Sequence, residues 1–150
     1  MGREPDGLGW RALVSAALRR RKVLVMRWLI ASIYMLTALV GLYWSVSLTL
    51  TGLYGVPFSW AYAALFVGAL LLAAGSVLTG AATRGWTLWL PVTGSGIVAG
   101  YFVWATLLLM RDYYKEGLED FSTLIMACAT LALVLGSLAL SVYNGLQTTK

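Results

Sequence analysis

The chain has 150 residues, of which 60% are hydrophobic and only 11% are charged, and its net charge is +5 at pH 7. Soluble domains carry about 25% charged residues over their surface, so this composition excludes an ordinary soluble protein. Most of the positive excess lies in the first 27 residues, beside a long apolar segment. It therefore indicates contact with anionic lipid headgroups, and we expect no nucleic acid as a partner.

The residue types present exclude most reaction chemistry. The chain has no histidine and one cysteine, Cys128. Histidine-ligated metal, bis-histidine haem, thiolate clusters and an imidazole base are therefore excluded. No Asp, Glu, Lys or Arg falls inside an apolar segment long enough to span a membrane, so there is no intramembrane proton relay of the usual kind. We expect no metal, no cofactor and no catalytic residue, and we predict that the protein is not an enzyme.

The N-terminal segment, residues 1–27, is basic and amphipathic. Trp10, Leu13, Val14, Ala17 and Leu18 recur at helical spacing, with arginines on the other faces. This pattern predicts a helix over 9–22 that lies in the plane of the lipid headgroups. The alternative is a helix docked on the cytoplasmic face of a partner protein. The residues expected at the membrane surface are Trp10, Arg11, Arg19, Arg20, Arg21, Lys22 and Arg27.

Residues 28–150 are predicted to form a four-span bundle. The predicted spans are 28–50, 60–80, 86–110 and 122–143, separated by short turns and by a charged loop over 111–121. Each is long enough to cross a hydrocarbon core of about 30 Å as a helix. Pro91 is expected to bend the third span. The predicted fold class is an all-α membrane protein, with four transmembrane helices in a bundle preceded by a basic amphipathic interfacial helix.

The distribution of Lys and Arg predicts the orientation of the spans. Nine of these residues fall in the N-terminal segment, in the loop after the second span and at the C-terminus, whereas the other two segments hold only Arg111 and Lys115. Loops rich in Lys and Arg stay on the cytoplasmic side. We therefore expect a multi-pass protein of the cell membrane with both termini in the cytoplasm.

Small residues are expected to hold the spans together, because lipid removes the hydrophobic drive between helices. The third span contains a GxxxG motif at Gly96 and Gly100, and the fourth has a small-residue seam over Ala129–Ala139. We expect Gly100→Leu to loosen the bundle by overpacking. The residues predicted to make helix contacts are Gly41, Gly68, Gly96, Gly100, Ala132 and Gly136.

Two aromatic pairs are the candidate ligand site. Tyr43 and Trp44 in the first span lie about as deep in the membrane as Tyr101 and Trp104 in the third. Such pairs can line a pocket for a lipid tail, a quinone or a carotenoid. The alternative is aromatic packing just below the outer membrane boundary.

The lack of reactive groups and the small-residue faces on every span lead to two functional hypotheses. The first is a non-catalytic accessory or structural subunit of a larger integral membrane complex, of a respiratory or other energy-converting kind. The alternative is a small homo-oligomeric channel or carrier for a neutral or hydrophobic solute, which has only Ser and Thr as polar lining. The expected partners are a bilayer with anionic lipids, and either other membrane subunits or further copies of the chain.

Overall fold

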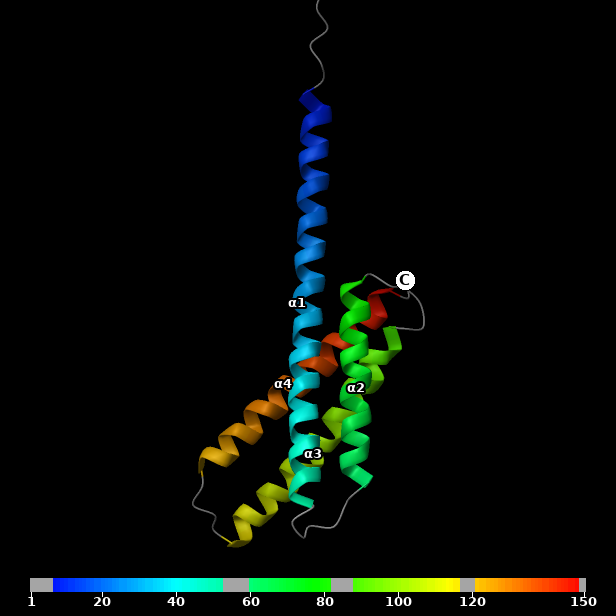
Figure 1. Ribbon diagram of the computed structural model, residues 1–150. Helices are drawn as coiled ribbons and strands as arrows, with labels where there is room; N and C mark the ends of the chain where they lie inside the picture. Colours follow the sequence, from blue (N-terminus) through cyan, green and yellow to red (C-terminus); the bar gives the residue numbers. More distant parts are fainter. Residues whose placement is uncertain (1–6, 53–59, 82–87, 117–120, 149–150) are drawn as a thin grey trace, which may run out of the picture.

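The computed structural model describes residues 7–52, 60–81, 88–116 and 121–148 (Figure 1). These residues form four helices, α1 (Gly7–Gly52), α2 (Trp60–Gly80), α3 (Trp89–Glu116) and α4 (Phe121–Thr148). Each helix is long and apolar enough to cross a membrane. The predicted all-helical bundle with four such helices is therefore confirmed.

The four helices pack as two antiparallel pairs. α1 and α2 lie side by side, while α3 and α4 run obliquely across them (Figure 1). Each helix packs mainly on its neighbour in the chain, and α1 meets α3 and α4 at only a few positions. α4 is the least covered of the four. The bundle therefore leaves long helix faces open on its outside.

α1 is one continuous helix of 46 residues, about 69 Å long at ~1.5 Å per residue. The expected break between a helix over 9–22 and a first span over 28–50 is absent. The reason is local, since residues 10–40 contain neither glycine nor proline and nothing there interrupts the helix. α2 has 21 residues, about 31 Å, which matches a hydrocarbon core. α1 is therefore much longer than a membrane crossing requires.

The expected bend at Pro91 is also corrected. α3 begins at Trp89, not at residue 86, so Pro91 lies in its first turn. Backbone N–H groups of the first turn have no partner within the helix, so a proline there removes no hydrogen bond. α3 also continues to Glu116 and α4 to Thr148, beyond the predicted ends of their spans. Charged residues end an apolar span, but they do not end a helix.

The close packing of α2 on α3 depends on glycines. A Cβ atom added at Gly94 would lie 2.6 Å from the backbone nitrogen of Leu72 and 2.8 Å from the carbonyl oxygen of Gly68. One added at Gly75 would lie 2.7 Å from the ring of Pro91. These positions admit no side chain, so the two backbones approach closely. Between α1 and α2, a Cβ at Gly41 would lie 3.1 Å from that of Ala69.

The GxxxG contact predicted at Gly96 and Gly100 is not present within the described bundle. A Cβ atom at Gly96, Gly100 or Gly136 would meet nothing within 4 Å, and Ala132 is exposed. α3 turns Gly94, Ser95, Val98 and Phe102 inward instead. Gly96 is two residues from Gly94, which places it about 200° around the helix. The small-residue faces of α3 and α4 that the sequence offers therefore point outward.

Candidate functional site

The structure describes each aromatic pair on its own helix. Tyr43 and Trp44 pack edge to face on α1, with ring centroids 6.2 Å apart, and their side chains are 69% and 41% exposed. On α3 the ring centroids of Tyr101 and Trp104 are 6.0 Å apart, and Trp104 is half exposed. Each pair consists of near neighbours on one helix. Neither pair contributes a residue to the two grooves between α1 and α2 that are described next.

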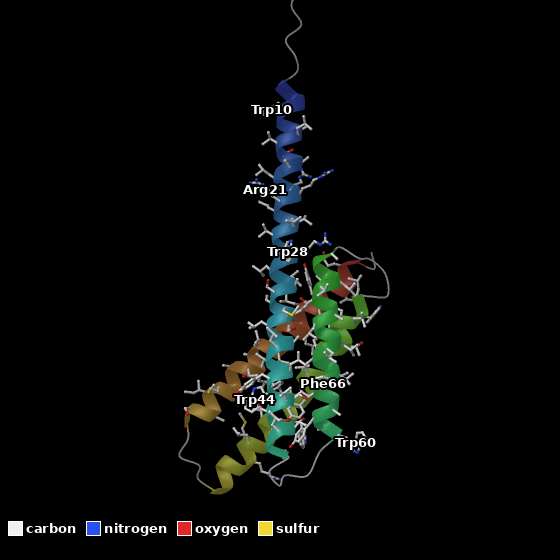
Figure 2. The ribbon with its side chains drawn as sticks, viewed as in Figure 1. Trp10, Arg21, Trp28, Trp44, Trp60 and Phe66 are labelled. Carbon is white, nitrogen blue, oxygen red and sulfur yellow. The ribbon has the colours of Figure 1, made fainter. Side chains whose placement is uncertain are left out.

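Two apolar grooves lie between α1 and α2. The first has a volume of about 320 Å³, and we call it the Phe66 groove. It is lined by Ser45, Val46, Thr49, Leu50, Tyr62, Ala63 and Phe66. The second, the Trp28 groove, has a volume of about 460 Å³. It is lined by Trp28, Ala31, Ser32, Met35, Ser76, Val77, Gly80 and Ala81. Trp28 lies level with the end of α2, and Phe66 lies nearer its start (Figure 2).

Serine hydroxyls tie α1 to α2 beside both grooves. Ser76 donates a hydrogen bond of 2.7 Å to the carbonyl oxygen of Ala31, and Ser45 donates one of 3.0 Å to that of Tyr62. Both serines are buried. A buried hydroxyl without a partner is costly in an apolar interior. The two bonds therefore favour the one relative position of α1 and α2 in which both hydroxyls reach their acceptors.

A cation lies at one end of the Trp28 groove. Arg27 is partly buried, and its Nη2 donates a long hydrogen bond of 3.4 Å to the carbonyl oxygen of Thr79. Thr79 precedes Gly80 of the groove lining, and Arg27 lies one helical turn before Ala31. A guanidinium therefore lies close to the Gly80 end of the apolar groove, although Arg27 does not itself line it.

Several hydroxyl groups are buried between the helices. The Oγ atoms of Ser95 on α3 and Ser141 on α4 lie 2.9 Å apart, and each also bonds a carbonyl oxygen of its own helix. Tyr34 on α1 is 0% exposed, and its hydroxyl has no hydrogen-bond partner. The side chain of Asn144 on α4 lies near that hydroxyl. Neutral hydroxyls of this kind bind water or a carbonyl group, but they do not supply an acid, a base or a metal site.

Residues 7–26, which we call the α1 arm, extend beyond the ends of the other helices (Figures 1 and 2). Trp10 is 72% exposed and Leu13 is 66% exposed. Trp10, Leu13 and Ala17 precede the buried residues Ala31, Tyr34 and Ala38 by 21 positions each. A shift of three heptads turns a straight helix by only about 60°. The arm therefore continues the packing face of α1 without a helix to pack on.

The residues predicted at the membrane surface all lie on α1, and those whose side chains are described are exposed, apart from the partly buried Arg27. Sequence reasoning missed Tyr34, Ser95 and Ser141. A signal for two of them is present in the sequence, since Ser95 follows Gly94 and Ser141 lies one helical turn after Ser137. Tyr34 lies on the same stripe of α1 as the buried residues Ala31 and Ala38, but its own burial was not predicted.

Comparison with known proteins adds no identity. The chain matches no protein-family model, and neither the characterised proteins nor the solved structures include a significant match. The function must therefore be argued from the helices and their surfaces.

Proposed function

We propose that this protein is a non-catalytic subunit of a larger integral membrane complex, and that the α1 arm docks it on a partner subunit. The observation that carries the proposal is the arm itself. Its 20 residues extend about 30 Å from the bundle. Its apolar side chains, including Trp10, Leu13 and Leu18, are exposed.

A helix with an exposed apolar face of this size requires a protein or membrane surface that buries this face. Isolated helices of this length are marginal in water, and their stability in proteins comes mainly from packing an apolar face. Large exposed apolar patches on helices mark contacts with proteins or membranes. Because the packing face of α1 continues along the arm, another helix can pack there as α2 does on the rest of α1.

The alternative is that the apolar face of the α1 arm lies on the membrane surface. A helix that lies in the headgroup plane has to turn through about a right angle from a spanning helix, and such a turn needs a break near residues 22–27. α1 has no glycine, proline or irregular turn there. The straight helix supports docking on a protein that projects into the cytoplasm. The interfacial placement of residues 9–22 is the alternative that the test must separate from it.

The charge of the arm argues for a different chain as partner. Arg19, Arg20, Arg21 and Lys22 are consecutive and exposed. Copies of this chain in one membrane have parallel arms, so pairing them would place these cations side by side. Like charges at that distance repel. The partner surface is therefore expected to be acidic, and respiratory or other energy-converting assemblies are the class of complex that we propose.

The outward faces of α3 and α4 provide room for further subunits within the membrane. Gly96 and Gly100 on α3, and Gly136 on α4, expose backbone to open space. Small residues at such positions let another membrane helix approach closely. Lipid can also pack on these faces, so they are consistent with a subunit role but are not specific evidence for it.

The experiment that tests the proposal is isolation of the chain from its native membrane in a mild detergent. The expected result is that the chain migrates with a larger protein in fixed proportion. A chain that is recovered alone, after the detergent has been shown to preserve other complexes of the same membrane, would contradict the proposal.

We further propose that all four helices span the cell membrane with both termini in the cytoplasm. The support is the excess of Lys and Arg, nine against two, in the segments assigned to the inside. The loop between α3 and α4 then faces outward. We expect Gly117→Cys to react with an impermeant thiol reagent applied to intact cells, in a Cys128→Ser background. Reaction only after the membrane is opened would reverse the orientation.

The second candidate function is a small homo-oligomeric carrier or channel for a neutral solute. The observation that favours it is that two buried hydroxyl groups, those of Tyr34 on α1 and Ser137 on α4, lack a hydrogen-bond partner. Free hydroxyls in a bundle interior can bind a small polar solute. Flux of such a solute into liposomes that contain only this chain would favour this candidate over a subunit role.

A further inference from the structure

The Trp28 groove lies where a spanning bundle meets the headgroups. α2 has the length of a hydrocarbon core, about 31 Å, and the groove reaches its last residue, Gly80. Trp28, which is 60% exposed at this end, is the residue type that membrane boundaries favour. Figure 2 shows Trp28 beside the end of α2, with Arg21 farther along the α1 arm.

The interior of the groove suits a hydrocarbon chain. Among its described lining residues, the polar side-chain groups are the hydroxyls of Ser32 and Ser76 and the indole N–H of Trp28. Both hydroxyls are already used, since Ser32 donates 2.8 Å to the carbonyl oxygen of Trp28 and Ser76 donates 2.7 Å to that of Ala31. The one remaining side-chain donor in the described lining is the indole N–H of Trp28, and a single donor does not match the many polar groups of a sugar or a peptide. From Trp28 to Met35 the groove runs along about 10 Å of α1.

The end of the groove suits an anion. The guanidinium of Arg27 has five N–H donors, and within the described part of the chain it uses one of them, at 3.4 Å from the oxygen of Thr79. No Asp or Glu occurs in the sequence between Gly7 and Arg111. The counter-charge for Arg27 therefore comes from outside this stretch of chain, and a phosphate matches the planar donor fork of arginine.

We infer that the Trp28 groove binds one anionic glycerophospholipid, with an acyl chain between α1 and α2 and its phosphate on Arg27. No cationic residue is among the described residues that line either groove, but Arg27 lies beside the Gly80 end of the Trp28 groove. No Lys or Arg occurs in the sequence from Trp28 to Thr83, the stretch that holds every residue of the Phe66 groove lining. The inference does not rest on the proposed subunit role, because it requires only the chain itself and lipid.

The test uses the purified full-length chain in detergent, with retained lipid counted by native mass spectrometry. The two probes are phosphatidylglycerol and phosphatidylcholine with identical acyl chains. We expect phosphatidylglycerol to bind about fivefold more tightly, which is the factor that one basic residue near the surface contributes. Inorganic phosphate should not displace it, because phosphate lacks the chain that fills the groove.

Two substitutions, each with a matched control, separate the contribution of the lipid headgroup from that of the acyl chain. Arg27→Gln should abolish the preference between the two lipids, whereas Arg21→Gln removes the same charge from the arm and should leave the preference intact. Gly80→Leu should weaken both lipids alike by filling the groove. The leucine has room, because a Cβ at Gly80 would meet only that of Ala31, at 4.0 Å. Gly100→Leu adds the same side chain in open space away from the groove and serves as its control.

Several outcomes would overturn the inference. Equal binding of the two lipids to the unmodified chain would do so. An equal loss of preference in Arg21→Gln and Arg27→Gln would show diffuse attraction to the whole basic segment. Unchanged lipid binding in Gly80→Leu would place the acyl chain elsewhere, and displacement by inorganic phosphate alone would indicate an anion site without a lipid.

Discussion

Gly94→Ala should lower the thermal midpoint of the protein in detergent, while Gly100→Ala should not. The added methyl group at residue 94 would lie 2.6 Å from the nitrogen of Leu72 and 2.8 Å from the oxygen of Gly68. Both are backbone atoms, so they cannot move aside without separating α2 from α3. Overpacking of this kind costs about 1–3 kcal/mol, and rigid backbone neighbours place Gly94 at the upper end.

Gly100→Ala is a matched control on the same helix. Its methyl group meets nothing within 4 Å. Because alanine favours a helix over glycine by roughly 0.5–1 kcal/mol, this change should be neutral or slightly stabilising. Equal destabilisation by the two changes would mean that α3 is rotated in the bundle and that Gly96 and Gly100 face a neighbouring helix after all.

Tyr34→Ala should destabilise the bundle strongly, and Tyr34→Phe should not. Tyr34 is 0% exposed and packs with Ile30, Ala38 and Leu72 at the centre of the bundle. Removing a buried aromatic ring costs about 3–5 kcal/mol. The phenylalanine variant keeps the ring and removes a hydroxyl that has no hydrogen-bond partner, so its effect should be neutral or favourable.

Denaturation of the two Tyr34 variants in mixed detergent gives this comparison directly. If Tyr34→Phe destabilises the protein as much as Tyr34→Ala, the hydroxyl holds a bound water or solute in the membrane. That result would favour the carrier function over the subunit role.

The sequence predicted the helices better than their ends. The residues of α2, Trp60–Gly80, agree with the predicted span 60–80 because glycine and proline flank that apolar run. The ends of α1, α3 and α4 differ because polarity sets where a span ends, whereas capping and chain breakers set where a helix ends. The arm follows from this difference, since α1 runs on through Arg19–Lys22 without a break.

The choice between packing faces could not be made from the sequence. Gly94 and Gly96 are both candidates for a close contact on α3, and they lie on nearly opposite sides of the helix. In a soluble protein the polar side would be excluded from the core. In a membrane protein both sides are apolar, so hydropathy does not rank them. The contact of Gly94 with Leu72 and Gly68, seen in the structure, identifies the inward side.

The candidate site was hidden for a similar reason. The aromatic pairs at Tyr43 and Tyr101 were visible because aromatic residues stand out in a sequence. The Trp28 groove is formed by small residues on two helices, such as Ala31 and Gly80, that are 49 positions apart in the chain. Its position depends on how α1 and α2 are rotated against each other, which no local pattern specifies.

The central claim is that the α1 arm docks this chain on a partner subunit, and the co-migration of two arm variants from the native membrane measures it most directly. Leu13→Glu places a charge on the arm's packing face, whereas Ser15→Glu adds the same charge about 200° away on the same exposed helix. We predict that Leu13→Glu releases the chain from its larger partner, while Ser15→Glu migrates with the partner as the unmodified chain does. Equal co-migration of both variants, or recovery of the unmodified chain without a partner, would contradict the claim.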